Sequence, residues 1–381
     1  MRKINLIRVT TIPISLEVLL KGQLKYLNNF YRVIAVSSGG EKLKIVNERE
    51  GVDTHVVEME REISVLKDCR SLLKMITLFK KLKPEIVHAN TPKASLISMV
   101  AAWICNVPHR IYTVTGLRFE TATGIKREIL IWMEMLTCSC ANTVVAESNG
   151  VKRILKQNNI CKKRTHIIGS GNINGIDEDY WDPLSLDKNS NLSIRNKLQI
   201  QNSTFIFIFI GRLVPDKGIT ELITAFTKIK NQDCKLLIIG EQEQSFRLLD
   251  ANVIKEFENN SNIISVGYQS DVRQYLAISH ALVLPSYREG FPNVILQAGA
   301  MGLPCIATKV NGVEDIIDNN NGIIIDKKDV LGLNRAMIYM MKNYIRYDKM
   351  YCRNKIVHGY SQKSFFPKMV EFYEKVINGN V

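Results

Sequence analysis

The sequence predicts an α/β protein that contains two doubly wound parallel sheets, each of the Rossmann-like kind. Three observations favour this fold: short apolar runs alternate with helical stretches, a polar segment interrupts the alternation once, and the alternation then resumes. Strands that alternate with helices form parallel sheets covered by helices on both faces. The 381 residues, 46% of them hydrophobic, are enough for two such domains.

The first half contains strand-like runs rich in Val and Ile, separated by amphipathic or apolar helical stretches. The predicted strands cover residues 4–9, 32–38, 54–59, 85–90, 110–116, 142–148 and 165–171, and helices are expected at 16–30, 66–82 and 94–107. The segment 172–191 (NINGIDEDYWDPLSLDKNSN) is polar and rich in turn residues, which is typical of a domain boundary. This boundary predicts a first domain over 1–175.

The second half repeats the pattern. Strands are expected at 204–211, 235–240, 262–267, 280–285, 304–310 and 322–326, and the stretch ITELITAFTKI has the apolar spacing of a helix with one buried face. The repeated pattern predicts a second domain over 176–363. The segment 364–381 is predicted to form a terminal amphipathic helix, and its periodicity leaves open whether it crosses back to the first domain.

Composition narrows the class of protein. Eight cysteines without CxxC or metal-ligand spacing, after a start that lacks a signal peptide, predict reduced thiols in a cytoplasmic protein that needs no metal. Residues 1–200 carry 30 Lys and Arg against 19 Asp and Glu, whereas residues 201–381 carry 21 against 18. The basic excess of the first half suggests an anionic partner, with a solvated basic surface as the alternative.

The stretch FIGRLVPDKGITEL (209–222) has the pattern of a phosphate site. A buried strand ends at Gly211, a loop carries Arg212 and Lys217, and a helix begins near Gly218. A helix N-terminus favours an anion, and two cations beside it suit a diphosphate. The alternative is a pair of solvent-facing loop charges.

The stretch PSYREGFPNVILQAGAMGLP (285–304) places Glu289 at a strand exit and Gln297 inside the helix after it. Both side chains would reach the same edge of the sheet, where a sugar-bearing ligand offers hydroxyl donors. The alternatives are an exposed turn acid and a helix-surface amide. Near residue 267, the loop that holds Gly267 and Tyr268 comes after another strand, and its backbone could hold a nucleobase.

Together, GRLVPDKG, GYQSDV and PSYREGFPNVILQAGAMGLP resemble the donor domain of the family 4 retaining glycosyltransferases, which have the GT-B fold. That fold has two Rossmann-like domains facing a cleft. The stretches at 87–103, 111–138 and 169–177 resemble a bacterial subgroup that builds capsules, O-antigens and other lipid-linked glycans.

The resemblance implies a role for each matching position. Arg212 and Lys217 would hold the nucleotide diphosphate, and Glu289 would contact the donor sugar in the catalytic centre. The remaining donor-binding positions would be Gly211, Gly267, Tyr268, Gly290, Phe291, Pro292, Asn293 and Gln297.

Two positions depart from the family pattern. Gln297 stands where the family usually has a second glutamate, and Thr115 stands where it often has a histidine. An amide oxygen still accepts a hydrogen bond from a ribose hydroxyl. A threonine hydroxyl is no general base near neutral pH, although in retaining enzymes of this kind the leaving phosphate is thought to take the acceptor's proton.

The first domain is expected to receive the acceptor, a lipid-linked saccharide such as one on undecaprenyl diphosphate. The acceptor-side residues would be Ser15, His88, Thr91, Lys93, Thr115, Arg118 and Lys126. For His88 the alternative is a hydrogen-bonded core histidine, and for Ser15 and Thr91 it is helix capping.

The stretch GIKREILIWMEMLTCSC (124–140) is apolar on more than one face. It suits a core helix, with partial burial in a membrane interface as the alternative, which would make the protein peripheral at the inner face of the plasma membrane. Such a protein would bind an anionic membrane surface.

The sequence thus predicts an enzyme: a retaining glycosyltransferase that uses a nucleotide sugar, most simply UDP-linked, to extend a lipid-linked saccharide without a cofactor. Two alternatives stay open: a non-catalytic partner of another transferase with the same fold, and a nucleotide-sugar epimerase. A dinucleotide oxidoreductase is disfavoured because no G-x-G-x-x-G comes after the first strand, and no nucleic-acid-binding module is recognisable.

Overall fold

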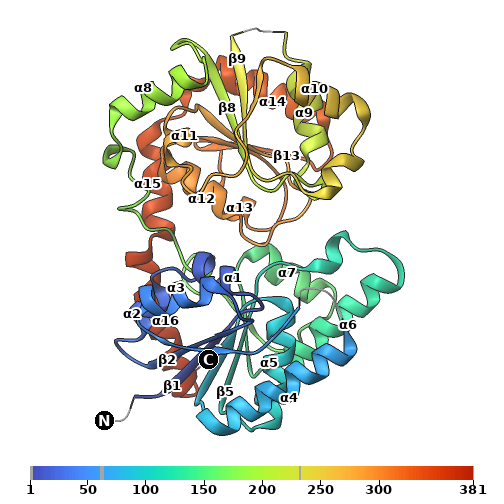
Figure 1. Ribbon diagram of the computed structural model, residues 1–381, viewed down its shortest axis with the longest axis vertical. Helices are drawn as coiled ribbons and strands as arrows, with labels where there is room; N and C mark the ends of the chain where they lie inside the picture. Colours follow the sequence, from blue (N-terminus) through green and yellow to red (C-terminus); the bar gives the residue numbers. More distant parts are fainter. Residues whose placement is uncertain (1–2, 61–63, 231–232, 381) are drawn as a thin grey trace. The chain divides into compact units, whose positions relative to one another are not determined.

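The computed structural model describes residues 3–60, 64–230 and 233–380, and the chain forms two compact units (Figure 1). Unit 1 comprises Met1–Gly175 together with Gln362–Val381, and unit 2 comprises Ile176–Ser361. The chain therefore crosses from unit 1 to unit 2 after Gly175 and returns after Ser361. We call these two places the outgoing and the returning crossing.

Unit 1 is built on a seven-stranded parallel sheet with the strand order β3-β2-β1-β4-β5-β6-β7. The strands are β1 (Asn5–Val9), β2 (Arg32–Ser37), β3 (Asp53–Val56), β4 (Ile86–Ala89), β5 (His109–Val114), β6 (Thr143–Ala146) and β7 (Thr165–His166). The helices are α1 (Pro13–Leu19), α2 (Gln23–Leu27), α3 (Glu41–Glu50), α4 (Val65–Leu82), α5 (Pro92–Ile104), the 3₁₀ turn η1 (Arg118–Thr121), α6 (Gly124–Cys140), α7 (Asn149–Gln157) and α16 (Gln362–Ile377).

Unit 2 is built on a six-stranded parallel sheet with the strand order β10-β9-β8-β11-β12-β13. The strands are β8 (Phe205–Ile210), β9 (Cys234–Ile239), β10 (Ile263–Ser265), β11 (Ala281–Leu284), β12 (Cys305–Thr308) and β13 (Gly322–Ile325). The helices are η2 (Pro183–Ser185), α8 (Lys188–Lys197), η3 (Pro215–Lys217), α9 (Ile219–Thr227), η4 (Gln244–Leu248), α10 (Ala251–Asn259), α11 (Arg273–Ala277), α12 (Asn293–Ala300), α13 (Val313–Ile316), α14 (Val330–Lys342), η5 (Tyr344–Arg346) and α15 (Lys349–Tyr360).

Each predicted strand range overlaps a strand, and the two parallel sheets confirm the predicted fold class. Continuous apolar runs carry this signal: β8 reads FIFIFI, and its four central residues are buried. A strand that is covered on both faces needs apolar side chains pointing both ways, so the run does not alternate with polar residues.

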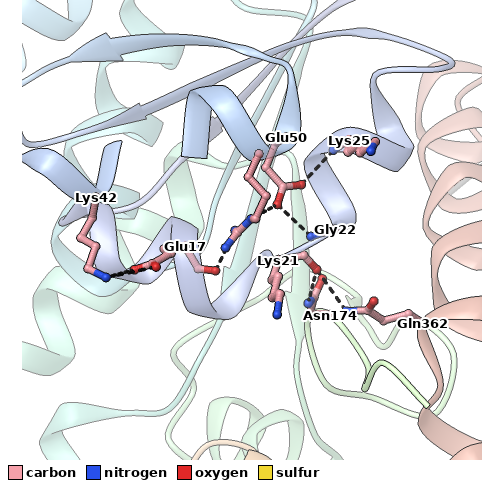
Figure 2. A network of polar contacts seen from close by, with 9 residues as sticks. Glu17, Lys21, Gly22, Lys25, Lys42, Glu50, Asn174 and Gln362 are labelled. Carbon is pink, nitrogen blue, oxygen red and sulfur yellow. Dashed lines mark hydrogen bonds and ion pairs between the residues drawn. The ribbon is translucent and has the colours of Figure 1, made fainter. Parts of the chain in front are cut away.

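The predicted single helix over 16–30 is wrong, because the chain forms α1 and α2 with a break at Gly22. Gly22 has φ +78°, which ends the helical path. The carboxylate of Glu50 then accepts hydrogen bonds from Gly22 N (3.0 Å) and Lys25 N (3.1 Å), as Figure 2 shows. A buried acid from α3 thus supplies the partners that the first N–H groups of α2 need.

Helix α16 packs on unit 1, beside α2 (Figure 1). Phe365, Phe366, Met369 and Tyr373 are buried in the same apolar cluster as Leu6 of β1. Burial of these four side chains, at about 25 cal/mol per Å² of apolar surface, fixes the last helix on the unit in which the chain began.

Candidate functional site

The candidate site of unit 2 lies where the order of its strands reverses. From β8 the chain moves to β9 on one side, and β11 later pairs with β8 on the other side. The loops after β8 and β11 therefore leave the sheet in opposite directions. Open α/β sheets bind ligands at such a switch point, outside the carboxyl ends of the strands.

At this switch point the structure brings Lys217 and Glu289 together. Lys217 is the last residue of η3, in the loop after β8, and its Nζ lies 2.5 Å from Oε1 of Glu289, in the loop after β11. The two side chains are 22% and 13% exposed, so both keep access to solvent. A cation and a carboxylate from loops 72 residues apart thus meet at the carboxyl edge of the sheet.

Backbone contacts hold these two loops in place. Gly218 comes directly after Lys217 with φ +70°, and a Cβ atom there would lie 2.1 Å from the carbonyl oxygen of Pro285. Nearby, Tyr287 N donates to the Asp216 carbonyl at 2.8 Å. Only glycine permits such an approach, so Gly218 fixes the loop that carries Lys217 against the loop that carries Glu289.

Arg212 lies in the same loop as Lys217 but pairs elsewhere. Its Nη1 lies 2.7 Å from Oε1 of Glu243, in the loop after β9, and its side chain is 61% exposed. An exposed ion pair is weak and exchanges partners readily. The residues alone gave no reason to single out Glu243, because it belongs to no motif.

Three strands of unit 2 are each followed by a glycine, and these glycines contact one another. Gly240 N, after β9, donates to the Gly267 carbonyl at 3.0 Å, and a Cβ on Gly240 would lie 1.8 Å from the Gly211 carbonyl oxygen. The structure thereby connects the predicted residues Gly211 and Gly267 through Gly240, which sequence reasoning missed. A glycine at the end of each apolar run, directly after β8 and β9 and two residues after β10, was the signal that could have found it. Tyr268 is exposed beside Gly267, at the edge strand β10.

The other predicted donor-side residues surround the start of α12. Pro292 is the N-cap residue of α12 and Asn293 its first residue, and Gln297 lies further along the same helix, half-buried. Gly290 is half-buried, whereas Phe291 is buried and its ring lies 5.5 Å from that of Tyr360. The side chain of Phe291 therefore belongs to the core, so only its backbone could take the predicted donor-binding role.

Unit 1 has its own switch point, between β1 and β4. Thr91, after β4, accepts a hydrogen bond from Thr11 N at 2.8 Å, and the two hydroxyls lie 2.7 Å apart. Thr115, after β5, donates to the Asn90 carbonyl at 2.8 Å. Ser15 is half-buried in α1, the first helix after β1. The structure thus gathers Thr91 and Thr115 at one edge. Thr91 occupies the N-cap position of α5, yet its hydroxyl does not cap the helix.

His88 does not lie at the surface of this edge. It is fully buried, its Nδ1 lies 2.7 Å from the Tyr373 hydroxyl, and its Nε2 lies 2.7 Å from the Thr113 hydroxyl. Burial, with a smaller contribution from Arg8, holds the pKa of His88 well below its usual value. The placement of His88 among the acceptor-side residues is therefore corrected: it is the hydrogen-bonded core histidine of the alternative.

The predicted cations of unit 1 have different surroundings. Lys93 is buried and forms an ion pair with Asp68 of α4, so it is not free to meet an anionic acceptor as predicted. Arg118 lies beside Lys93 and Glu134 around a small cavity between α5 and α6, and Lys126 is exposed near the start of α6. Of the predicted cations, Lys126 is the one that solvent reaches freely.

Glu134 of α6 is a buried acid that sequence reasoning missed. It accepts a hydrogen bond from the Tyr112 hydroxyl at 2.6 Å, and burial raises the pKa of Glu134 to about 7. An acid whose pKa is raised on folding stabilises the folded state below its unfolded pKa, and this contribution is lost as the pH rises through the folded pKa.

We therefore expect Glu134→Gln to raise the free energy of unfolding at pH 8 by about 2–3 kcal/mol relative to the wild type. At pH 5 the difference should largely vanish, because Glu134 is then protonated in the folded protein. Urea unfolding at both pH values measures this. Glu128→Gln, on an exposed part of the same helix, is the control. An equal effect of Glu134→Gln at both pH values would contradict the expectation.

Among the described residues, His, Cys, Asp and Glu side chains form no group of three or more that could hold a metal ion. Metal independence remains a prediction, as do the individual roles of the site residues.

Comparison with known proteins places this geometry in a family. A family model described as "Glycosyl transferases group 1" matches residues 190–356, and one described as "Glycosyl transferase 4-like domain" matches residues 26–171. The chain is 36% identical over 334 residues to the capsular polysaccharide biosynthesis glycosyltransferase CapM of Staphylococcus aureus, a match that covers 86% of this chain and 85% of that protein.

Two further proteins extend the comparison. The chain is 28% identical to the UDP-Gal:alpha-D-GlcNAc-diphosphoundecaprenol alpha-1,3-galactosyltransferase of Escherichia coli, over 84% of this chain and 82% of that protein. A glycosyltransferase structure from Rickettsia africae superposes with a TM-score of 0.79 over 99% of both chains at 20% identity, which shows a shared fold. The chain therefore belongs to the family 4 glycosyltransferases of GT-B fold that its donor-site motifs resemble.

Proposed function

We propose that this glycosyltransferase moves a hexose or N-acetylhexosamine from a UDP-linked sugar to a lipid-linked saccharide, with retention of configuration, in bacterial surface polysaccharide synthesis. The observation that carries the proposal is the pairing of Lys217 with Glu289 at the switch point of unit 2. Lipid-linked acceptors and UDP-sugars are supported by the E. coli relative, whose name states both.

In this proposal the diphosphate binds at the start of α9 and α12, where Lys217 contacts its oxygens. Arg212 exchanges its exposed contact with Glu243 for a phosphate. Negative charge grows on the diphosphate as the bond to the sugar breaks, and fixed cations stabilise that charge more than they stabilise the ground state. Glu289 then contacts the sugar through its carboxylate. The leaving phosphate takes the acceptor proton, so Thr115 need not act as a base.

A thermal-shift screen tests the donor. A ligand that binds the folded state alone raises stability by RT ln(1 + [L]/Kd), so UDP-sugars at about 100 times Kd should add about 2.7 kcal/mol, and GDP- and ADP-sugars less. Gln297→Glu should increase the shift if this side chain accepts from the ribose hydroxyls, and Gln297→Leu should decrease it. Equal shifts with all three nucleotides would contradict the choice of UDP.

Transfer by the purified protein alone separates the proposal from its main alternative. A non-catalytic partner of another transferase would bind the nucleotide without moving sugar, whereas the enzyme should transfer sugar from UDP-sugars to a lipid-diphosphate saccharide. NMR analysis of the product then determines the anomeric configuration of the transferred sugar. A configuration inverted relative to the donor would reject the retaining mechanism.

The exposed surface of α6 supports attachment to a membrane. Ile125, Ile129, Trp132 and Met135 are exposed apolar residues of α6, and Lys126 is exposed beside them. An amphipathic helix with basic residues suits the interface of anionic lipid. Among the described residues no helix is long and apolar enough to cross a bilayer.

We expect the protein to sediment with vesicles that contain anionic lipid at about 0.01 M salt and to be released at about 1 M salt, because the screening length falls from about 30 Å to about 3 Å. Lys126→Glu should weaken binding, and Lys228→Glu, at a lysine of unit 2, should not. Binding that ignores salt would show that electrostatic attraction does not attach the protein.

A further inference from the structure

The core of unit 1 contains a cation whose partners are neutral. Arg8 of β1 is fully buried, and its Nη1 donates to Gln23 Oε1 (2.5 Å) and the Tyr373 hydroxyl (3.1 Å), while Nη2 donates to Asn90 Oδ1 (2.8 Å). Within the described residues its Nε has no partner. A buried charge without an opposite charge costs several kcal/mol, so apolar residues would fill this place at a lower cost. The presence of an arginine here therefore needs a reason, and its three hydrogen-bond partners supply one.

The first partner connects Arg8 to the outgoing crossing. Gln23 is the first residue of α2, and its Nε2 donates to the Ile173 carbonyl at 2.7 Å and to Asn174 Oδ1 at 3.2 Å. The first segment of unit 1 ends directly afterwards, at Gly175. The side chain of Gln23 thus connects Arg8, through hydrogen bonds, to the last residues before the chain leaves unit 1.

The second partner connects Arg8 to α16, the helix that follows the returning crossing. Tyr373 lies on α16, which begins where the chain re-enters unit 1. Because Arg8 can only donate, the Tyr373 oxygen accepts from Arg8, and its own proton is free to go to Nδ1 of His88. The neutral His88 ring then donates through Nε2 to the Thr113 hydroxyl on β5. The direction of each hydrogen bond in this chain is set by the arginine.

The third partner connects Arg8 to the switch point of unit 1. Asn90 comes directly after β4, and its carbonyl accepts the hydrogen bond from Thr115. Asn90 also precedes Thr91, which bonds to Thr11 after β1. A shift of the Arg8 guanidinium would therefore move the loops after β1, β4 and β5 together.

A second contact joins the two crossings outside the core. Figure 2 shows that the carbonyl of Lys21 accepts hydrogen bonds from Asn174 Nδ2 and Gln362 Nε2, both at 3.0 Å. Lys21 precedes Gly22, whose N–H is held by Glu50. The unit 1 ends of both crossings thus share one anchor at the surface. In the core, Arg8 is connected to the outgoing end through Gln23 and to the interior of α16 through Tyr373.

We propose that Arg8 is a positioning residue that couples the last residues before the outgoing crossing, and the helix α16 that follows the returning crossing, to the switch-point loops of unit 1. Its fork of donors suits this role, because one guanidinium binds three elements at fixed angles. The inference rests on the proposed function in one respect: it takes the loops at Asn90, Thr91 and Thr115 to be those that receive the acceptor. The coupling itself is independent of the substrate.

Two hydroxyl deletions in the same apolar cluster test the coupling. Tyr373→Phe removes the hydroxyl that accepts from Arg8, whereas Tyr31→Phe removes one that lies outside these contacts, from a ring 5.6 Å from that of Tyr373. Hydrogen–deuterium exchange of the whole protein should be faster by at least about threefold to tenfold in Tyr373→Phe at residues 88–91 and 172–175, because the lost hydroxyl makes buried hydrogen bonds to both Arg8 and His88. Tyr31→Phe should leave both segments unchanged.

Steady-state kinetics give the second readout. Tyr373→Phe should lower kcat by about threefold to tenfold through misplacement of the acceptor loops, with the donor KM unchanged. Arg8→Lys, which keeps the charge but loses the fork, should do the same, and Tyr31→Phe should match the wild type.

Equal exchange at both segments in the two Phe variants, or faster exchange at one segment alone, overturns the coupling. Faster exchange at both with unchanged kcat overturns the positioning role. Absence of transfer by the wild-type protein rejects the proposed function instead, and the exchange data then still decide the coupling.

Discussion

Replacing Lys217 with alanine should lower kcat for sugar transfer by about 10²–10³-fold, the usual effect of removing one group that stabilises charge in the transition state. Lys217 is the expected site of this loss because its ammonium group lies beside Glu289 at the switch point, in the loop that leads into α9. The donor KM should change less than kcat, because the diphosphate carries more charge in the transition state than in the ground state. Initial rates at varied UDP-sugar concentration measure both.

Lys228→Ala is the matched control, because Lys228 lies at the other end of α9. Its kcat should equal that of the wild type. Glu289→Gln removes the partner charge while keeping the shape of the side chain. Urea unfolding of the Lys217 and Glu289 variants then shows whether a loss of activity is accompanied by a loss of stability. An unchanged kcat/KM in Lys217→Ala, with the protein folded, would reject the role given to this lysine.

Gly218→Ala should lower the free energy of unfolding of unit 2 by about 3–5 kcal/mol, a large effect for one methyl group. The added Cβ would lie 2.1 Å from the Pro285 carbonyl oxygen, and a backbone atom cannot move aside as the end of a side chain can. In addition, φ is +70°, which disfavours any residue with a Cβ. Urea unfolding measured by circular dichroism reports the loss.

Gly267→Ala separates the two causes. Gly267 has φ +68°, close to that of Gly218, but nothing lies within 4 Å of the Cβ it would gain. This variant should lose only the backbone preference, about 1–2 kcal/mol. If both variants lose the same stability, the close approach of Gly218 to the loop after β11 contributes nothing measurable, and the fixed placement of Lys217 against Glu289 loses its explanation.

The strands were predictable because their signal is local. Runs such as FIFIFI and CKLLII are largely apolar along their length, which a sheet covered on both faces requires, and each forms a parallel strand. The helix predicted over 16–30 failed for a non-local reason. Its apolar spacing is continuous, but Gly22 takes a left-handed conformation and Glu50, from another helix, caps the start of α2.

The site was predictable in part. Lys217 and Glu289 each come after an apolar strand, and the carboxyl ends of neighbouring parallel strands meet at one edge, so their proximity results from fold and motif. The acceptor side was less predictable. The sequence around a histidine in a strand is the same whether its side chain points to solvent or to the core. The core orientation of His88 depends on Tyr373, 285 residues away.

By itself, the sequence determined the two sheets, the polar segment between them and the family, because apolar periodicity and loop motifs are local properties of the chain. Tertiary structure alone decided the partners of the charged and polar side chains: Arg212 with Glu243, Lys93 with Asp68, and Arg8 with three neutral groups. The physical reason is that a polar group must find a hydrogen-bond partner wherever the chain has folded, and nothing near it in sequence says which distant residue that will be.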